Sequence, residues 1–186
     1  AAASATTTKS GPFDRLPSSS LDAAFQGICL SESAVLQVFQ AVCLGVQALH
    51  AAGFAHHDIK PHNVMLSNST IDAETKVVLI DLGSCGPVAK IEVRSGAEAG
   101  MLEDRFSTTC SMPSRAPELW GNISKGARIC GGEADVWSLG CLLYSLAFGL
   151  PFGPFETAAE GVRKLAILNA TFCVPPSNAN RSAALA

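Results

Sequence analysis

The chain has 186 residues, of which 48% are hydrophobic, so it is long and apolar enough for one domain with a core, and intrinsic disorder is excluded as its main character. Its net charge of -3 and its pI near 5.8, with no polybasic run, argue against a nucleic-acid or anionic-lipid surface. Seven cysteines without a C-x-x-C pair predict buried thiols in a reducing, intracellular compartment rather than a disulfide framework. The longest apolar run, residues 137–152, is shorter than the ~20 residues that a membrane span needs.

Composition and apolar spacing predict the elements of the first half. Residues 1–29, rich in Ala, Ser and Thr, are predicted to be a mobile linker or insertion. Apolar residues at helical spacing then predict a helix from about Ser33 to Ala52, which Gly53 ends. Residues 64–66 and 77–80 are short apolar stretches with a polar connection, which is typical of the two strands of a hairpin.

The second half begins with a long glycine-containing segment, residues 81–118, whose middle at 99–106 has weak helical character. A loop is predicted at 126–132. The most apolar helical pattern follows at 133–149, and an amphipathic helix is predicted at 156–169.

The stretch from His56 to Asn63 places an acid, a cation and an amide at short fixed spacings between the first long helix and the first strand. Phosphoryl transfer needs a base for the hydroxyl, a cation for the developing phosphate charge and oxygen ligands for Mg²⁺. Asp58, Lys60 and Asn63 supply one of each. We expect the hairpin to set a second carboxylate, Asp81, beside Asp58.

Simpler readings of these residues exist. Asp58 and Asp81 could be ordinary turn acids, since Asp is common in loops. The histidines of residues 56–62 could bind zinc, although no further Cys or His stands at a suitable spacing. Residues 107–109 could form a polar loop or a phosphorylation site, with equal weight.

Motifs in a fixed order give the chain a resemblance to protein kinases. The catalytic-loop pattern H-R-D-x-K-x-x-N is similar to His56-His57-Asp58-Ile59-Lys60-Pro61-His62-Asn63, and the metal motif D-F-G to Asp81-Leu82-Gly83. The A-P-E motif is matched by Ala116-Pro117-Glu118. The start of the long buried helix of the large lobe is similar to Asp135-Val136-Trp137-Ser138-Leu139-Gly140. The resemblance implies an α+β fold that is mainly helical. It assigns residues 30–176 to part of a kinase large (C-terminal) lobe with a short β-hairpin beside the catalytic loop, and leaves 177–186 as an indeterminate tail.

The resemblance also implies catalytic roles. Asp58 would accept the proton of the substrate hydroxyl, and Lys60 would steady the transferring phosphate of ATP. Asn63 and Asp81 would hold Mg²⁺. ATP and Mg²⁺ are therefore the expected cofactors.

Other residues would support the loop and the activation segment. The hydroxyl of Ser111 would bridge the acid and the lysine, Asp135 would anchor the backbone of the catalytic loop, and Glu118 would brace the activation segment from inside. Gly83 completes the metal motif. Independently of the resemblance, His56 is expected to donate a hydrogen bond to the backbone near Asp81.

Two features refine the resemblance to the serine/threonine class. Lys60 lies two residues after the acid and Ser111 five residues before Ala116. The extended segment after Asp81 is similar to that of the Numb-associated kinase group, and within it to the myristoylated and palmitoylated serine/threonine kinase branch. In that group the activation segment has an extra helix, which would fall at 101–107. Protein substrates and an intracellular, cytoplasmic location are implied, with peripheral membrane association open.

The sequence departs from the kinase pattern at several points. His57 replaces an arginine that usually pairs with an activation-loop phosphate, so activity is expected not to depend on that phosphorylation. No G-x-G-x-x-G or V-A-I-K pattern is present, so the small lobe is expected in a longer parent protein and the chain alone is expected to be inactive. Glu118 is expected to be buried without its usual arginine partner.

The predicted function is therefore phosphorylation of protein Ser or Thr hydroxyls by the parent protein. The alternative is a pseudokinase or truncated scaffold that binds protein partners without catalysis. The presence of Asp58, Lys60, Asn63 and Asp81 favours the enzyme, and the missing lobe favours the scaffold.

Overall fold

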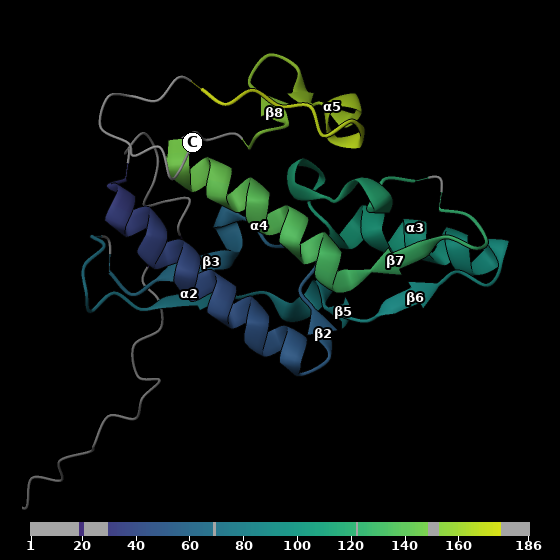
Figure 1. Cartoon of the computed structure of the whole chain (residues 1–186), viewed down its shortest axis with the longest axis horizontal. Helices are drawn as coiled ribbons and strands as arrows, with labels where there is room; N and C mark the ends of the chain where they lie inside the picture. The colour runs from purple at the N-terminus through teal and green to yellow at the C-terminus, as the bar shows by residue number, and fades with distance from the viewer. Residues whose placement is uncertain (1–18, 21–29, 69, 122, 149–152, 176–186) are drawn as a thin grey trace, which may run out of the picture.

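The computed structural model describes residues 19–20, 30–68, 70–121, 123–148 and 153–175. Two long helices, α2 (Glu32–Ala51) and α4 (Gly131–Phe148), lie side by side and run in opposite directions (Figure 1). Helix α3 (Gly96–Thr109) lies to the right of this pair, and the elements that follow α4 lie at the top of the same view. The segments that connect α2 to α4 in the sequence therefore pack against this helix pair.

Helix α2 forms because its apolar residues recur at spacings of three and four. The Ser31 hydroxyl caps its start by accepting a hydrogen bond from the Ala34 N–H at 3.3 Å. Gly53, with φ +91°, follows its end in a conformation that favours glycine. By length and composition α2 could also cross a membrane, but its buried valines belong to the main core. The predicted helix is confirmed to within one residue at each end.

The main core lies between α2, α4 and the first hairpin. Its buried members are Val35, Val38, Val42, Val46, Ile59, Val64, Leu66, Leu142 and Leu146. Ile59 belongs to the predicted catalytic loop and is fully buried. The loop is therefore anchored by a buried apolar side chain, with polar residues on either side of it in the sequence.

The predicted hairpin is confirmed. Strands β3 (Val64–Leu66) and β4 (Val77–Leu79) pair antiparallel, with Val64 opposite Leu79. Strand β1 (Ser19–Ser20) pairs with the other edge of β3. This pairing was not predicted, because both serines fall in the segment that the sequence assigns to a linker; the rest of residues 1–29 lies outside the described residues.

The segment between the hairpin and α4 is built from short elements around α3. Two antiparallel pairs form, one from β2 (Phe54–Ala55) with β5 (Gly86–Pro87) and one from β6 (Lys90–Glu92) with β7 (Arg128–Cys130). Single 3-10 turns lie at η1 (Pro61–Asn63), η2 (Leu82–Ser84), η3 (Met112–Ser114) and η4 (Pro117–Leu119).

The structure confirms one prediction for this segment and contradicts another. The weak helical character at 99–106 is confirmed as part of α3, which Ser95 caps by accepting a hydrogen bond from the Glu98 N–H at 3.1 Å. The predicted loop at 126–132 is wrong, because residues 128–130 pair with β6 and α4 already begins at Gly131.

The predicted helix at 156–169 is also wrong. The structure has strands β8 (Glu156–Thr157) and β9 (Gly161–Val162), followed by the short helix α5 (Lys164–Leu168). Gly161 has φ +65° and turns the chain between them, which a continuous helix does not permit. Beneath them Trp137 stacks on Phe155, with ring centroids 5.3 Å apart.

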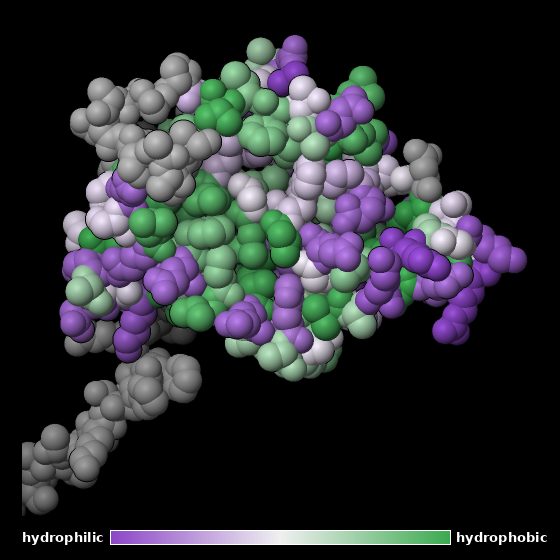
Figure 2. Space-filling model, in the orientation of Figure 1, coloured by the Kyte–Doolittle hydropathy of each residue, from purple (hydrophilic) through white to green (hydrophobic). Residues whose placement is uncertain are grey.

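Apolar and hydrophilic side chains are unevenly distributed over the face seen in Figure 1. Apolar side chains gather in its middle, over α2 and α4, and hydrophilic side chains cover the end where α3 lies (Figure 2). Helix α4 accordingly exposes apolar residues such as Val136, which is 64% exposed. Its sequence is apolar on more than the side that faces the core.

Candidate active site

Asp58 is a buried carboxylate that collects hydrogen bonds from both sides of the site. Lys60 Nζ donates to its Oδ2 at 2.7 Å, and Asn63 Nδ2 donates to the same oxygen at 3.0 Å and to the Asp58 carbonyl at 2.8 Å. The backbone N–H of Ser111 donates to Oδ1 at 3.0 Å. The acid, cation and amide that the sequence predicts to act together are therefore brought together by the structure.

These partners decide the charge of Asp58. Burial by itself raises the pKa of this carboxyl, but the hydrogen bonds from Lys60 and Ser111 outweigh burial and hold the pKa below its ordinary value. Asp58 is therefore ionised near neutral pH and able to accept a hydrogen bond from a hydroxyl donor.

Lys60 joins the catalytic loop to the turn η3. Its Nζ also donates to Ser111 Oγ at 2.7 Å, so the hydroxyl and backbone of one serine contact both the lysine and the acid. The Lys60 side chain is 28% exposed, which leaves its ammonium partly accessible from solvent. The predicted bridge through Ser111 matches this geometry.

A second buried carboxylate, Asp135 at the start of α4, holds the backbone of the loop. It is fully buried and accepts from the His56 N–H at 2.7 Å and from the His57 N–H at 2.8 Å. The ring of His50 lies 2.8 Å from Asp135 Oδ2. His50 was not predicted as a site residue; it is a partner of Asp135 that ties the end of α2 to α4.

The ring of His56 connects the loop to the strand that precedes Asp81. Its Nε2 donates to the Ile80 carbonyl at 3.0 Å, as predicted, while its Nδ1 accepts from the Asp58 N–H at 3.3 Å. Both bonds require the neutral tautomer with its proton on Nε2. The backbone of the acid is thus fixed against the end of the hairpin.

His57 is a buried residue whose ring packs against α3. It is buried with φ +67°, and neither ring nitrogen has a hydrogen-bond partner among the described residues. Its ring packs edge-on against Phe106 of α3, with centroids 5.6 Å apart. Burial lowers the pKa of His57, although nearby Asp135 opposes this. The ring is therefore neutral near pH 7, in agreement with the expectation from the sequence.

Asp81 is held near the catalytic loop by a backbone hydrogen bond of the preceding residue. The neighbouring Ile80 N–H donates to the Asn63 carbonyl at 2.8 Å, so the strand end lies against the loop. Asp81 itself is exposed with φ +64°, and its carboxylate accepts from the Gly83 N–H at 3.3 Å. Among the hydrogen bonds of the described residues, none joins its side chain to Asp58 or Asn63. The predicted meeting of the two carboxylates stays a prediction.

The donors present nevertheless suit Mg²⁺. The Asn63 Nδ2 donates to Asp58, and because the side-chain amide is planar these bonds also fix the direction of its oxygen, which is not used in them. Together with the exposed Asp81 carboxylate it offers hard oxygen ligands, and Mg²⁺ is commonly held by one or two such groups together with phosphates and waters. Over the described part of the chain, no cluster of three or more His, Cys, Asp or Glu side chains could hold a metal ion by itself.

Comparison with known proteins decides the family. The sequence model of the protein kinase domain matches residues 13–182. The chain belongs to the protein kinase family. It is 35% identical over 160 residues to serine/threonine-protein kinase 16 of Rattus norvegicus and 34% identical to that of Homo sapiens, covering 86% of this chain and 49% of each relative. It is 36% identical over 122 residues to serine/threonine-protein kinase ppk13 of Schizosaccharomyces pombe, covering 66% of this chain and 33% of the relative. The chain thus spans about half the length, or less, of these curated relatives.

The position of Glu118 differs from the expectation. Glu118 is exposed rather than buried, so it does not brace the segment from inside and the cost expected for a buried unpaired charge does not arise. The A-P-E stretch is instead fixed through its neighbours, since Ala116 and Leu119 are buried and the Trp120 Nε1–H donates to the Arg115 carbonyl at 3.0 Å.

Two arginines that were not predicted as site residues order the segment between Asp81 and Glu118. Arg105 Nη2 donates to the Cys85 carbonyl at 2.7 Å, and Arg115 Nη2 donates to the carbonyls of Cys110 at 2.6 Å and Ser107 at 3.2 Å. These bonds join α3 to the turns before and after it. Backbone carbonyls are present in every sequence, so no residue pattern could have marked them as the partners.

Proposed function

We propose that the chain forms the large lobe of a serine/threonine protein kinase, which transfers the terminal phosphoryl group of ATP to Ser or Thr hydroxyls of protein substrates. The observation that supports this most is the set of bonds from Lys60, Asn63 and Ser111 to Asp58. An ordinary turn acid needs no such set of partners. We also propose an intracellular, cytoplasmic location, with peripheral membrane attachment as a feature of the parent protein; the six described cysteines are free thiols, as a reducing compartment requires.

In the proposed mechanism Asp58 Oδ accepts the hydrogen bond, and then the proton, of the substrate hydroxyl. Lys60, held by Asp58 and Ser111, places a positive charge beside the group in transfer. Asn63 and Asp81 would hold Mg²⁺, which neutralises phosphate charge when bound. Asp135 fixes the loop backbone, so that Asp58 needs no rearrangement before the reaction.

We assign the chain to the Numb-associated kinase group, in the branch of the myristoylated and palmitoylated kinase. Helix α3 supports this assignment, because it covers residues 101–107, where an extra activation-segment helix is expected in that group. The contacts of Arg105, Phe106 and Arg115 hold this helix in place without a phosphate group.

We further propose that activity needs a small lobe that supplies the phosphate-covering loop and the ATP-positioning lysine. Correct positioning of reactants can contribute about 7–11 kcal/mol to lowering a barrier, so the 186-residue chain by itself should show no measurable turnover. Turnover by the isolated chain that disappears in Asp58→Asn would overturn this part of the proposal.

The central test compares Asp58→Asn with Asp104→Asn in the full-length protein, using ATP, Mg²⁺ and a Ser-containing protein substrate. Asp104 is an exposed residue of α3, so it controls for the loss of one negative charge. General-base catalysis contributes about 10²–10⁴-fold, so Asp58→Asn should lower the rate by at least a hundredfold while Asp104→Asn leaves it unchanged. No phosphorylation by the unaltered protein would favour a scaffold instead.

A further inference from the structure

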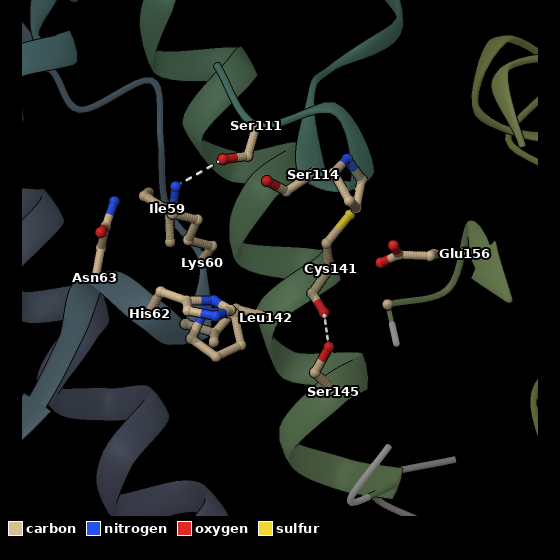
Figure 3. A pocket seen from close by; sticks show the side chains of 13 residues that line it. Ile59, Lys60, His62, Asn63, Ser111, Ser114, Cys141, Leu142, Ser145 and Glu156 are labelled. Atoms are coloured by element: carbon tan, nitrogen blue, oxygen red, sulfur yellow. Dashed lines mark hydrogen bonds between the residues drawn. The ribbon is translucent and has the colours of Figure 1, made fainter. Parts of the chain in front are cut away.

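A cavity of about 500 Å³ opens directly beside the catalytic residues (Figure 3). It lies between the catalytic loop, the turn η3, the middle of α4 and the segment that leads into β8. Lys60 and Ser111, which both contact Asp58, form part of its wall. A substrate chain whose hydroxyl reaches Asp58 can therefore place a neighbouring residue over this cavity. Its volume lies within the range of ligand pockets.

Most of the cavity wall is apolar or has its polar groups already engaged. Pro61, Pro113 and Leu142 are apolar, and burial raises the pKa of the Cys141 thiol to about 12, so that it stays neutral. The hydroxyl of Ser145 donates to the Cys141 carbonyl at 3.2 Å. Such a wall suits the aliphatic part of a long side chain.

Glu156 differs from the rest of this wall. It is half-buried, its carboxylate points toward Cys141 and the cavity in Figure 3, and no hydrogen bond or ion pair of that carboxylate is present among the described residues. Its backbone is held by pairing with Val162 across β8 and β9. Lys60, the cation in the same wall, is already paired with Asp58. A partly desolvated carboxylate that faces an apolar cavity favours a cationic ligand.

We infer that Glu156 is a specificity-determining residue, which selects protein substrates with a Lys or Arg side chain a few residues from the phosphorylated hydroxyl. The inference rests on the proposed kinase function and names its substrate class. The aliphatic stem of the basic side chain would pack on Pro113 and Leu142, and its charged end would pair with Glu156. The cavity would then determine which residues are preferred near the phosphorylated Ser or Thr of the substrate.

The test uses Ser-containing peptides in which one position at a time is Lys, norleucine or Glu, phosphorylated by the full-length protein. Norleucine keeps the aliphatic stem without the charge, so the ratio of kcat/KM for Lys to that for norleucine isolates the contribution of the carboxylate. For a half-buried ion pair we expect a ratio of about five at one position. Glu156→Gln should bring this ratio to about one, and Glu156→Lys should make the Glu peptide the preferred one.

The matched control is Glu160→Gln, since Glu160 follows closely in the chain but is 69% exposed and pairs with Arg163 at 3.5 Å. Its Lys to norleucine ratio should equal that of the unaltered protein. Glu156→Gln should keep the circular dichroism spectrum and the melting temperature of the unaltered protein, which shows that the fold is intact. Glu156→Asp keeps the charge on a shorter stem and should retain a ratio above one.

Two results would overturn the inference: a ratio near one at every position for the unaltered protein, or a ratio that survives Glu156→Gln. If no peptide is phosphorylated at all, the proposed kinase function fails separately. In that case fluorescence anisotropy of the same labelled peptides with the 186-residue chain decides the inference. Tighter binding of the Lys peptide that is lost in Glu156→Gln supports it, and equal binding of the Lys and norleucine peptides refutes it.

Discussion

Replacing Asp135 by Asn tests whether one buried carboxylate holds the catalytic loop in place. The amide keeps one acceptor oxygen but presents an NH₂ donor on its other side, so the N–H of either His56 or His57 loses its acceptor. A hydrogen bond to a charged group contributes about 1.5–3 kcal/mol, and an unpaired buried donor costs about 1–3 kcal/mol. We therefore expect the free energy of unfolding to fall by about 3–5 kcal/mol.

Such a loss is a large part of the roughly 5–15 kcal/mol that stabilises a typical domain, so urea unfolding followed by circular dichroism will detect it. Asp104→Asn on the exposed side of α3 is the control and should change the free energy of unfolding by less than about 0.5 kcal/mol. A decrease below about 1 kcal/mol for Asp135→Asn would show that the loop is held by other contacts, and would refute the reasoning.

Three further predictions concern His57, the glycines of α4 and the contacts of α3. Burial lowers the pKa of His57 from its ordinary 6.5, so only the unfolded chain gains a proton as the pH first falls below that value. The free energy of unfolding should therefore drop with decreasing pH below about 6.5 and level off above it. In urea titrations from pH 5 to 8, His57→Asn, which tolerates the positive φ, should flatten this profile. In α4, a Cβ on Gly131 would collide with the Pro87 carbonyl and stand 2.8 Å from Ala55 Cβ, whereas a Cβ on Gly140 would meet open space. Gly131→Ala should therefore destabilise the fold by about 1–3 kcal/mol, and Gly140→Ala should stabilise it by about 1 kcal/mol. Equal melting temperatures of the two variants would contradict both. Phosphatase treatment of the full-length protein should leave its activity unchanged, because α3 is ordered by protein contacts; loss of activity would count against that role.

Local patterns predicted the elements that local physics controls. The valines of α2 recur at helical spacing and all of them face the core, so the helix could be located from the sequence to within a residue. Strands β3 and β4 could be predicted because each is a short apolar run next to turn residues. The acid, lysine and amide of the catalytic loop were found by their spacing, since the η1 turn keeps them within hydrogen-bond reach of one another.

The remaining features depend on contacts that are distant in the sequence. The apolar spacing of 156–169 fits a helix, but Gly161 adopts a left-handed conformation and β8 pairs with β9 instead. Residues 128–130 become a strand only because β6 lies beside them. His50 finds Asp135 across 85 residues, and the exposure of Glu118 follows from how the neighbouring turn packs. Apart from Gly161, these outcomes have no signal within a window of a few residues.

The ring of His56 makes the position of Asp58 sensitive to the register of a hairpin. One nitrogen is occupied by the Ile80 carbonyl at the end of the β3–β4 pair and the other by the Asp58 N–H. A one-residue slip of β4 would exchange the carbonyl for an outward-facing one, and the ring would lose the contact that fixes its orientation. Insertions in the connection of residues 67–76 should therefore be tolerated only when they leave the strand pairing unchanged, although that connection lies outside the site itself.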